Sequence, residues 1–368
     1  MRVATFNVEN LFRRPSAMSL NTWKQGKPIL TDFQRFCDLI ARDRYTPGAQ
    51  KEMVKLLVKY KLHLRKADKA EFLLLHEVRD KLFKIPRGST DPEIVATGRK
   101  DWDGWVELKK DEINSVAIDN TARVIQAVRP DVLAVVEAED RIALQLFNDQ
   151  VLKRFSATYE HNMLIDGNDA RGIDVGLYSR RPILSMRSNI DAGLPAGRIF
   201  SRDCAEYEID LGAGQSLWLL VNHLKSKGFG SADSSDARRQ KQAQTVADIY
   251  RTRHANHPFV IVAGDFNDTP NRAPLAPLLT GTNLRDAMTH PKYTSKPNAL
   301  PGTFGSGSAS GKIDYLLLSP ALWGRVQDVD VERRGVWAPR TFPHFPTITK
   351  VADAASDHAA VWVDLQIP

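Results

Sequence analysis

Cysteine is scarce in this 368-residue chain. Its two cysteines, Cys37 and Cys204, lie far apart and form no CxxC pair. We therefore expect neither a structural zinc site nor a disulfide framework, and two free thiols fit a reducing compartment best. Long apolar runs are also missing, and LWLLV at 217–221 is among the longest, so no segment is predicted to cross a bilayer. The first residues show no charged leader followed by an apolar core. A cytoplasmic location is expected, and secretion stays open if a leader was removed.

A strong bias in charge or composition is missing too. With 42% hydrophobic and 26% charged residues, the chain is not of the disordered, coiled-coil or collagen-like kind. The 51 basic and 44 acidic residues leave a net charge of +7, which indicates an anionic partner only weakly. Positive charge is concentrated at 51–72, where seven basic side chains meet three acidic ones. This segment predicts either a solvated helix face or a surface that contacts nucleic-acid phosphates through Lys51, Lys55 and Lys59.

Short apolar, β-branched runs recur along the chain with turn-forming residues between them. Continuous apolar runs of this length are typical of strands that are covered on both faces. They lie at residues 2–7, 132–138, 173–179, 217–223, 259–265, 313–319 and 360–365. Helical patterns separate some of them, one over 117–130 with a cap near Asp119 and one over 236–253. The alternation predicts a layered α/β fold.

One long segment interrupts this alternation. Residues 12–116 separate the first two predicted strands and contain no convincing strand, so we expect two or three helices there. Apolar side chains recur at helical spacing at Met53, Leu57, Tyr60 and Leu64. The sequence thus predicts one catalytic domain over 1–368 with a helical, partly basic insertion at 12–116.

Polar side chains stand at the ends of the predicted strands. They are Asn7, Glu9, Glu137, His223, Asp265, Asn267, Asp314, Asp357 and His358. A single carboxylate at a strand end would be interpreted as structural, but here the pattern repeats on six strands. In a mixed sheet the ends of such strands can meet at one rim. Carboxylate and amide oxygens suit Mg²⁺ or Mn²⁺ better than zinc. A divalent ion with acid–base groups in a cationic cleft is the equipment for phosphate ester hydrolysis.

The segments that carry these residues resemble, in their order, the endonuclease/exonuclease/phosphatase superfamily. They are ATFNVENL (4–11), DVLAVVEAED (131–140), RGIDVGLYSRRPI (171–183), VNHLKSK (221–227), GDFNDTP (264–270), KIDYLLLS (312–319) and SDHAAV (356–361). The resemblance covers residues 1–11 and about 117–368. It implies a four-layer α/β sandwich of two mixed sheets face to face with helices outside, and the helical insertion follows the first strand.

The resemblance also implies a metal site. Asn7 and Glu137 match the metal-binding Asn and Glu of the superfamily, and Glu9 and Asp357 match acidic positions near the metal. The usual Gln before the metal-binding Glu is Val136 here, so one hydrogen-bonding side chain behind the metal is missing. The implied cofactor is Mg²⁺ or Mn²⁺.

Catalytic roles follow from the same resemblance. Asp265 matches the Asp that activates or orients the attacking water, and Asn267 lies beside it at the phosphate or transition state. Asp314 resembles the Asp that orients the last His of the motif, which is His358. His223 resembles the second His of the deoxyribonuclease-like branch, which contacts the scissile phosphate.

Three cations near these motifs are candidates for binding the substrate phosphate. Lys225 and Lys227 follow His223, and Arg171 precedes the GIDVGLY strand. Each could equally be a solvated surface cation. A sphingomyelinase-like member would show an apolar membrane-contacting loop. Residues 337–350 (WAPRTFPHFPTITK) come nearest to one. Their Pro343, His344 and Phe345 could form a substrate loop, and a packing loop is the alternative.

The leading hypothesis is a divalent-metal-dependent nuclease that hydrolyses phosphodiester bonds, in DNA before RNA, and resembles predicted bacterial nucleases of the superfamily. One alternative is a phosphatase or phosphodiesterase that acts on a small phosphoester or a lipid headgroup. Another is a nucleic-acid-binding module without catalysis, against which the complete set of site residues argues. No protein partner is predicted, and a monomer is expected.

Overall fold

The computed structural model describes residues 1–9, 11, 13–17, 23–64, 70–112, 114–169, 172–227 and 232–367. The chain divides into two compact units. Unit 1 is made of Met1–Phe12 and Ile113–Pro368, and unit 2 of Arg13–Glu112.

Unit 1 contains two mixed sheets, each of six strands among the described residues. The first has the order β17 (Val326–Glu332), β18 (Ala360–Leu365), β1 (Arg2–Asn7), β8 (Val132–Ala138), β10 (Asp174–Ser179), β9 (His161–Leu164). The second has the order β11 (Ile183–Arg187), β12 (Cys204–Gly212), β13 (Gln215–His223), β14 (Val260–Asp265), β16 (Asp314–Leu318), β15 (Arg285–Asp286). All seven runs predicted as strands form central or near-central strands of these sheets.

The two sheets pack face to face because alternate side chains of each strand enter different cores. In β8, Ala134 and Val136 belong to the core between the sheets, where they join Ile261 and Ala263 of β14. The residues between them point the other way, and Val135 enters the core under the helices of the first sheet. Both faces of the central strands are therefore buried, which explains their continuous apolar runs.

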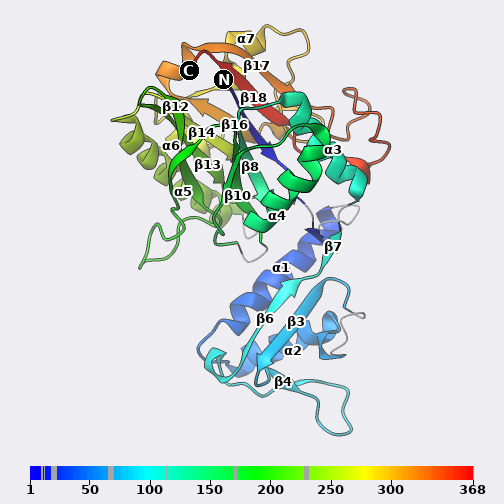
Figure 1. Ribbon diagram of the computed structural model, residues 1–368. Coiled ribbons are helices and arrows are strands. Elements are labelled where there is room, and N and C mark those ends of the chain that lie inside the picture. Colours follow the sequence, from blue (N-terminus) through cyan, green and yellow to red (C-terminus); the bar gives the residue numbers. More distant parts are fainter. Residues whose placement is uncertain are drawn as a thin grey trace. The chain divides into compact units, whose positions relative to one another are not determined.

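Helices form the outer layers (Figure 1). α3 (Ser115–Val128) and α4 (Arg141–Leu146) cover the first sheet, and α5 (Ala232–His254) with α6 (Ala276–Leu279) covers the second. Two single-turn helices, α7 (Pro291–Thr294) and α8 (Pro320–Trp323), lie in the connections around β15 and β16. The predicted four-layer α/β sandwich is confirmed.

The start of α3 differs from its prediction. Asn114 caps this helix, since its side-chain oxygen accepts from the backbone N–H of Val116 at 2.9 Å. Asp119 lies inside the helix and pairs with Arg154. A capping side chain must precede the first helical turn, and the apolar pattern predicted a start of the helix that lies after the observed one.

Unit 2 corrects the expectation of a helical insertion. Its described residues form the helices α1 (Trp23–Ile40) and α2 (Pro47–Lys59), but also three two-stranded sheets. These are β2 (Arg13–Pro15) with β7 (Lys110–Glu112), β3 (Leu73–Arg79) with β6 (Asp103–Leu108), and β4 (Phe83–Lys84) with β5 (Glu93–Ile94). The strands are short or rich in charged residues, so they lack the continuous apolar run on which the prediction of strands depended. Part of the basic segment, residues 65–69, lies outside the described residues.

A separate hydrophobic core holds unit 2 together. Trp102 is fully buried, and its indole N–H donates to the Tyr45 hydroxyl at 2.9 Å. Met53 and Leu57 of α2 are buried as the helical spacing predicts, whereas Leu64 is 40% exposed.

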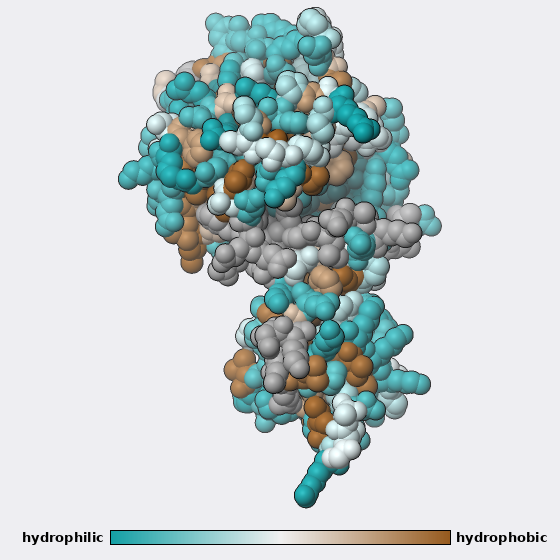
Figure 2. Space-filling view, turned by 90° about the vertical axis from the view of Figure 1, so that its right-hand side faces the viewer, coloured by the Kyte–Doolittle hydropathy of each residue, from teal (hydrophilic) through white to brown (hydrophobic). Residues whose placement is uncertain are grey.

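Hydrophobic side chains on the face seen in Figure 2 form small, separate spots on a largely hydrophilic surface. Within the described parts of the chain, no helix combines the length and the apolar character needed to span a bilayer.

Candidate active site

The central strands of both sheets end at a shared set of polar side chains. Asn7 ends β1, and Glu137 lies near the end of β8, which runs parallel to β1. In the second sheet His223 ends β13 and pairs in register with Asp265 at the end of the parallel strand β14. Asp314 begins the antiparallel neighbour β16, directly opposite Asp265. The strand order thus gathers groups that are far apart in sequence.

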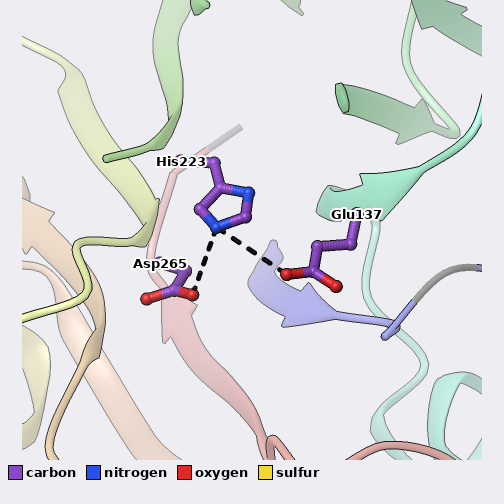
Figure 3. Close-up of side chains that lie close together, drawn as sticks. All are labelled: Glu137, His223 and Asp265. Carbon is purple, nitrogen blue, oxygen red and sulfur yellow. Dashed lines mark ion pairs between the residues drawn. The ribbon is translucent and has the colours of Figure 1, made fainter. Parts of the chain in front are cut away.

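Glu137 of the first sheet meets His223 and Asp265 of the second sheet at these strand ends (Figure 3). The Nε2 atom of His223 lies 3.7 Å from Glu137 Oε1 and 3.5 Å from Asp265 Oδ2. His223 and Asp265 are almost completely buried, and Glu137 is partly exposed. One imidazole therefore lies between a carboxylate from each sheet.

His358 forms a second contact, with Asp314. Its Nδ1 atom is 2.9 Å from Asp314 Oδ2, and the hydroxyl of Thr303 donates to the same oxygen at 2.5 Å. The other ring nitrogen, Nε2, lies 4.0 Å from Asp265 Oδ2. Burial lowers the pKa of His358, but the carboxylates, Asp314 first, outweigh burial and raise that pKa well above its ordinary value. His358 is thus held as an imidazolium that faces the centre of the site.

Asp265 is the central carboxylate. Burial raises its pKa to about 7, although the positive charge of His358 opposes this. The backbone N–H of Asn267 donates to Asp265 Oδ1 at 2.8 Å, and the Asn267 side chain donates to Oδ2 at 3.1 Å. The Asn7 amide also donates to Oδ2, at 3.3 Å. Amide donors from two sheets therefore fix the orientation of this carboxylate.

Three site residues adopt a left-handed backbone conformation that non-glycine residues seldom use. The φ angles are 51° at Glu9, 66° at Glu137 and 54° at Asn267. The conformation at Glu9 is supported because its N–H donates to Asn7 Oδ1 at 3.0 Å, and its carboxylate accepts from the N–H of Asp357 at 3.1 Å. Backbone outliers of this kind cluster where function requires a fixed geometry.

The donor set fits a divalent cation. The ligand atoms of Glu137, His223 and Asp265 lie within 4.8 Å of one another, and so do those of Asp265, Asp314 and His358. Carboxylate oxygens dominate both groups, and the Asn7 amide lies against Asp265. Carboxylate and amide oxygens of this kind suit a hard divalent ion.

Residues 112–358 match the sequence profile of the Endonuclease/Exonuclease/phosphatase family. The chain belongs to this family. Its members are hydrolases of phosphoester bonds and generally depend on a divalent metal, so the chain is a phosphoesterase with acidic and histidine groups placed to bind a metal.

Solved structures of the same superfamily are similar to the chain. A mannosyl-6-phosphatase of Bacteroides thetaiotaomicron is 16% identical, with 67% of this chain and 89% of that chain covered and a TM-score of 0.47. Truncated TDP2 of Caenorhabditis elegans is 19% identical over 68% and 90%, with a TM-score of 0.44. The human nocturnin catalytic domain is 15% identical over 70% and 88%, with a TM-score of 0.47. No curated protein sequence matches the chain.

The three cations predicted to bind the substrate phosphate differ from one another in their surroundings. Arg171 lies outside the described residues. The Lys227 ammonium is 2.6 Å from Asp268 Oδ1, and its side chain is half exposed. Lys225 is half-buried, and its backbone N–H donates to Gln242 at 2.7 Å. Their predicted phosphate contacts stay predictions.

The three lysines of α2 belong to unit 2. Lys51 and Lys55 are exposed or nearly so on the helix, and Lys59 pairs with Asp32 of α1. Their role in binding nucleic acid also stays a prediction.

The aromatic segment at 337–350 packs against the body of unit 1. Phe342 packs on the core between the sheets, and Phe345 packs on the core under α3. His344 stacks on Trp337 with ring centroids 5.0 Å apart. This is the packing loop that the sequence left as the alternative. Phe304, by contrast, is 40% exposed and lies edge-on to His358 at 5.0 Å.

Several residues that hold the site in place were missed by the sequence interpretation. Ser356 donates to the Asn7 carbonyl at 2.7 Å and accepts from the His358 N–H at 3.0 Å. Arg239 of α5 is fully buried and donates to Asp268 at 3.0 Å and to the Lys225 carbonyl at 2.5 Å. Ser356 and Asp268 stood inside the quoted motifs SDHAAV and GDFNDTP, whereas Arg239 gave no signal because it looked like one more charge on a polar helix.

Proposed function

We propose that the chain is a divalent-metal-dependent nuclease that hydrolyses phosphodiester bonds, with DNA as the preferred substrate. The single observation that carries the proposal is the assembly of two buried carboxylate–imidazole contacts at one set of strand ends, with Asp265 common to both. Such an assembly supplies a base, a cationic donor and a metal site within one small volume.

Glu137 and the Asn7 side-chain oxygen would hold the ion, with Glu9 and Asp357 close by. When bound, the ion would supply positive charge that offsets the negative charge on the phosphate during hydrolysis. Glu9 orients the Asn7 amide through its own N–H, and this leaves the Asn7 geometry independent of the substrate.

Asp265 orients a water molecule for in-line attack on phosphorus. Burial raises its pKa, which makes the carboxylate a stronger acceptor for the proton that the water loses. His358, charged and fixed by Asp314, donates a hydrogen bond to the phosphoryl oxygen on which negative charge develops. His223 stabilises the same transition state from the second sheet, where the Asn267 amide holds Asp265 in place beside the phosphate.

Charge supports a nucleic acid rather than a small ester as the substrate. The chain carries a net charge of +7, and its most basic stretch is the α2 region of unit 2. A polyanion that meets several lysines releases counterions, so its affinity falls steeply with salt. A small phosphoester would show a shallow salt dependence, which is how the phosphatase alternative would be recognised.

The test is cleavage of supercoiled plasmid and of single-stranded DNA with Mg²⁺ or Mn²⁺, with and without EDTA. We expect EDTA to abolish cleavage and Asp265→Asn to lower the rate by about a thousandfold or more, since the base is lost. Asp248→Asn, at an exposed carboxylate of α5, is the control and should retain the rate. Cleavage that persists in EDTA, or a near-normal rate for Asp265→Asn, would refute the mechanism.

A further inference from the structure

A second cavity lies beside the candidate active site. It has a volume of about 550 Å³, in the range that holds a drug-sized ligand. None of the residues assigned above to catalysis or metal binding lines it. Its walls come from the segments after β13 and β14, the α7 region, and the loop before β16.

Three chain segments border both the catalytic centre and this cavity. Lys227 lines the cavity four residues after His223, and Asn271 lines it four residues after Asn267. In the loop before β16, Thr303 contacts Asp314, whereas Ala309 and Ser310 line the cavity. These segments lead from the catalytic residues to the cavity wall within a few positions of the chain. A group attached to a phosphate in the active site could therefore enter the cavity.

Both lysines in the cavity wall contact a carboxylate. The Lys312 ammonium, which is nearly buried, lies 3.0 Å from the Asp286 carboxylate, and Lys227 lies 2.6 Å from Asp268. Since each cation already has a carboxylate partner, the cavity offers little to a second phosphate. The remaining wall favours an uncharged part of the substrate.

That wall combines flat apolar surfaces with hydrogen-bonding groups. The apolar part consists of Pro270, Met288, Tyr293 and Pro301. Hydroxyl and amide groups come from Thr269, Asn271, Thr289 and Ser310. We propose that the cavity is a subsite for the nucleoside joined to the scissile phosphate, with the base against the apolar surfaces and its polar edge and sugar on the hydroxyls and amide. This inference rests on the proposed phosphodiesterase function and names the group that the site selects.

Two chromogenic esters test the subsite. Thymidine 5′-(4-nitrophenyl phosphate) and methyl 4-nitrophenyl phosphate both release 4-nitrophenolate when water attacks phosphorus and the bond to the nitrophenyl oxygen breaks. They differ only in the group that stays on phosphorus, and the methyl group cannot fill the cavity. We expect the wild-type protein to prefer the thymidine ester by about tenfold or more in kcat/KM, because a filled pocket is worth this much discrimination.

A variant that fills the cavity separates this subsite from any other source of preference. Ala309 is exposed on the cavity wall, so Ala309→Trp should fold and should lower the preference for the thymidine ester by about tenfold. The control is Thr294→Trp, next to the lining residue Tyr293 but outside the lining, which should keep the wild-type preference. No preference in the wild type, or an unchanged preference in Ala309→Trp, overturns the subsite.

Binding distinguishes failure of the subsite from failure of the proposed function. If neither ester is hydrolysed with Mg²⁺ or Mn²⁺, the proposed function is wrong, but calorimetry with thymidine 5′-monophosphate still reports on the cavity. The subsite predicts that thymidine monophosphate binds at least about tenfold more tightly than inorganic phosphate, and that Ala309→Trp removes the difference. Equal affinities for the two ligands would overturn the subsite.

Discussion

At the scale of single residues, Thr303 controls the orientation of Asp314. Its hydroxyl donates to Asp314 Oδ2 at 2.5 Å and accepts from the Asp314 N–H at 3.1 Å. Thr303→Val keeps the shape but removes both hydrogen bonds. Because a hydrogen bond to a charged group contributes about 1.5–3 kcal/mol, we expect kcat for phosphodiester hydrolysis to fall by about tenfold or more.

The hydroxyl alone should explain that loss. Thr303→Ser keeps the hydroxyl, so it should restore most of the rate, measured as kcat on the methyl ester. If Thr303→Ser lost as much activity as Thr303→Val, the hydroxyl alone would not explain the loss, and the prediction would be wrong.

Asp203 gives a prediction about pH and stability away from the catalytic centre. Burial raises its pKa to about 6, against the N–H of Asn189, which donates to Oδ1 at 2.7 Å. Between about pH 4 and pH 6 the folded chain therefore binds more protons at this group than the unfolded chain, whose carboxyl has an ordinary pKa near 3.9. Raising the pH through this window lowers the free energy of unfolding.

Asp203→Asn should remove that pH-dependent loss while keeping the acceptor for Asn189. The free energy of unfolding of the variant minus that of wild type should therefore rise by up to about 3 kcal/mol between roughly pH 4 and pH 7, since one pKa unit corresponds to about 1.4 kcal/mol. Urea unfolding at both pH values measures this. Asp210→Asn, at a half-exposed position of β12, which begins directly after Asp203, is the control. Parallel pH profiles for wild type and Asp203→Asn would contradict the prediction.

At the scale of secondary-structure elements, α5 fixes the loops that follow β13 and β14. Arg239 is 0% exposed and joins the Asp268 carboxylate to the Lys225 carbonyl. Burial alone would raise the pKa of Asp268, but Lys227, the Thr269 N–H and Arg239 together lower it. Arg239→Met leaves part of this buried charge without a partner, so we expect the free energy of unfolding to fall by about 3–5 kcal/mol.

A double-mutant cycle isolates the pair. When Asp268→Asn is already present, Arg239 keeps only Asp236 as a carboxylate partner. Arg239→Met should then lower the free energy of unfolding by at least about 1 kcal/mol less than it does in wild type. Chemical denaturation measures all four proteins. Additive losses would mean that Arg239 stabilises α5 by packing and not through Asp268.

The same elements explain what the sequence could and could not predict. Strands such as β8 and β14 are buried on both faces, so their apolar runs predicted them to within two residues. The edge strand β11 exposes four of its five residues, and β12 alternates polar and apolar side chains, so neither has such a run. The strand-end carboxylates could be predicted as a group because polar residues after buried strands are rare. Contacts such as that of Arg239 with Asp268 depend on how distant loops pack, which no local pattern encodes.

At the scale of the whole molecule, the two units have separate cores. The clusters between the sheets and under α3 and α5 consist of unit 1 residues, whereas Trp102, Tyr45 and their neighbours fill unit 2. The chain leaves and re-enters unit 1 along β2 and β7, which pair Arg13 with Glu112. Because these two residues are neighbours in one ladder, a few residues could bridge the ends if unit 2 were removed.

We predict that unit 1 folds and keeps its chemistry without unit 2. In the variant, residues 13–112 are replaced by a short glycine–serine linker. It should unfold in one cooperative transition and hydrolyse methyl 4-nitrophenyl phosphate at a rate within about threefold of wild type, because every residue of the candidate active site lies in unit 1.

The affinity of the deletion variant for DNA should fall, and the slope of log affinity against log salt should become shallower by about 0.9 for each DNA phosphate that α2 neutralises in the wild type. The double variant Lys51→Ala, Lys55→Ala should reproduce part of this change, and Lys84→Ala, Lys100→Ala, which removes the same charge elsewhere in unit 2, should not. A deletion variant that binds DNA with the wild-type salt slope would move the nucleic-acid surface to unit 1, and one that fails to hydrolyse the small ester while folded would make unit 2 part of the active site.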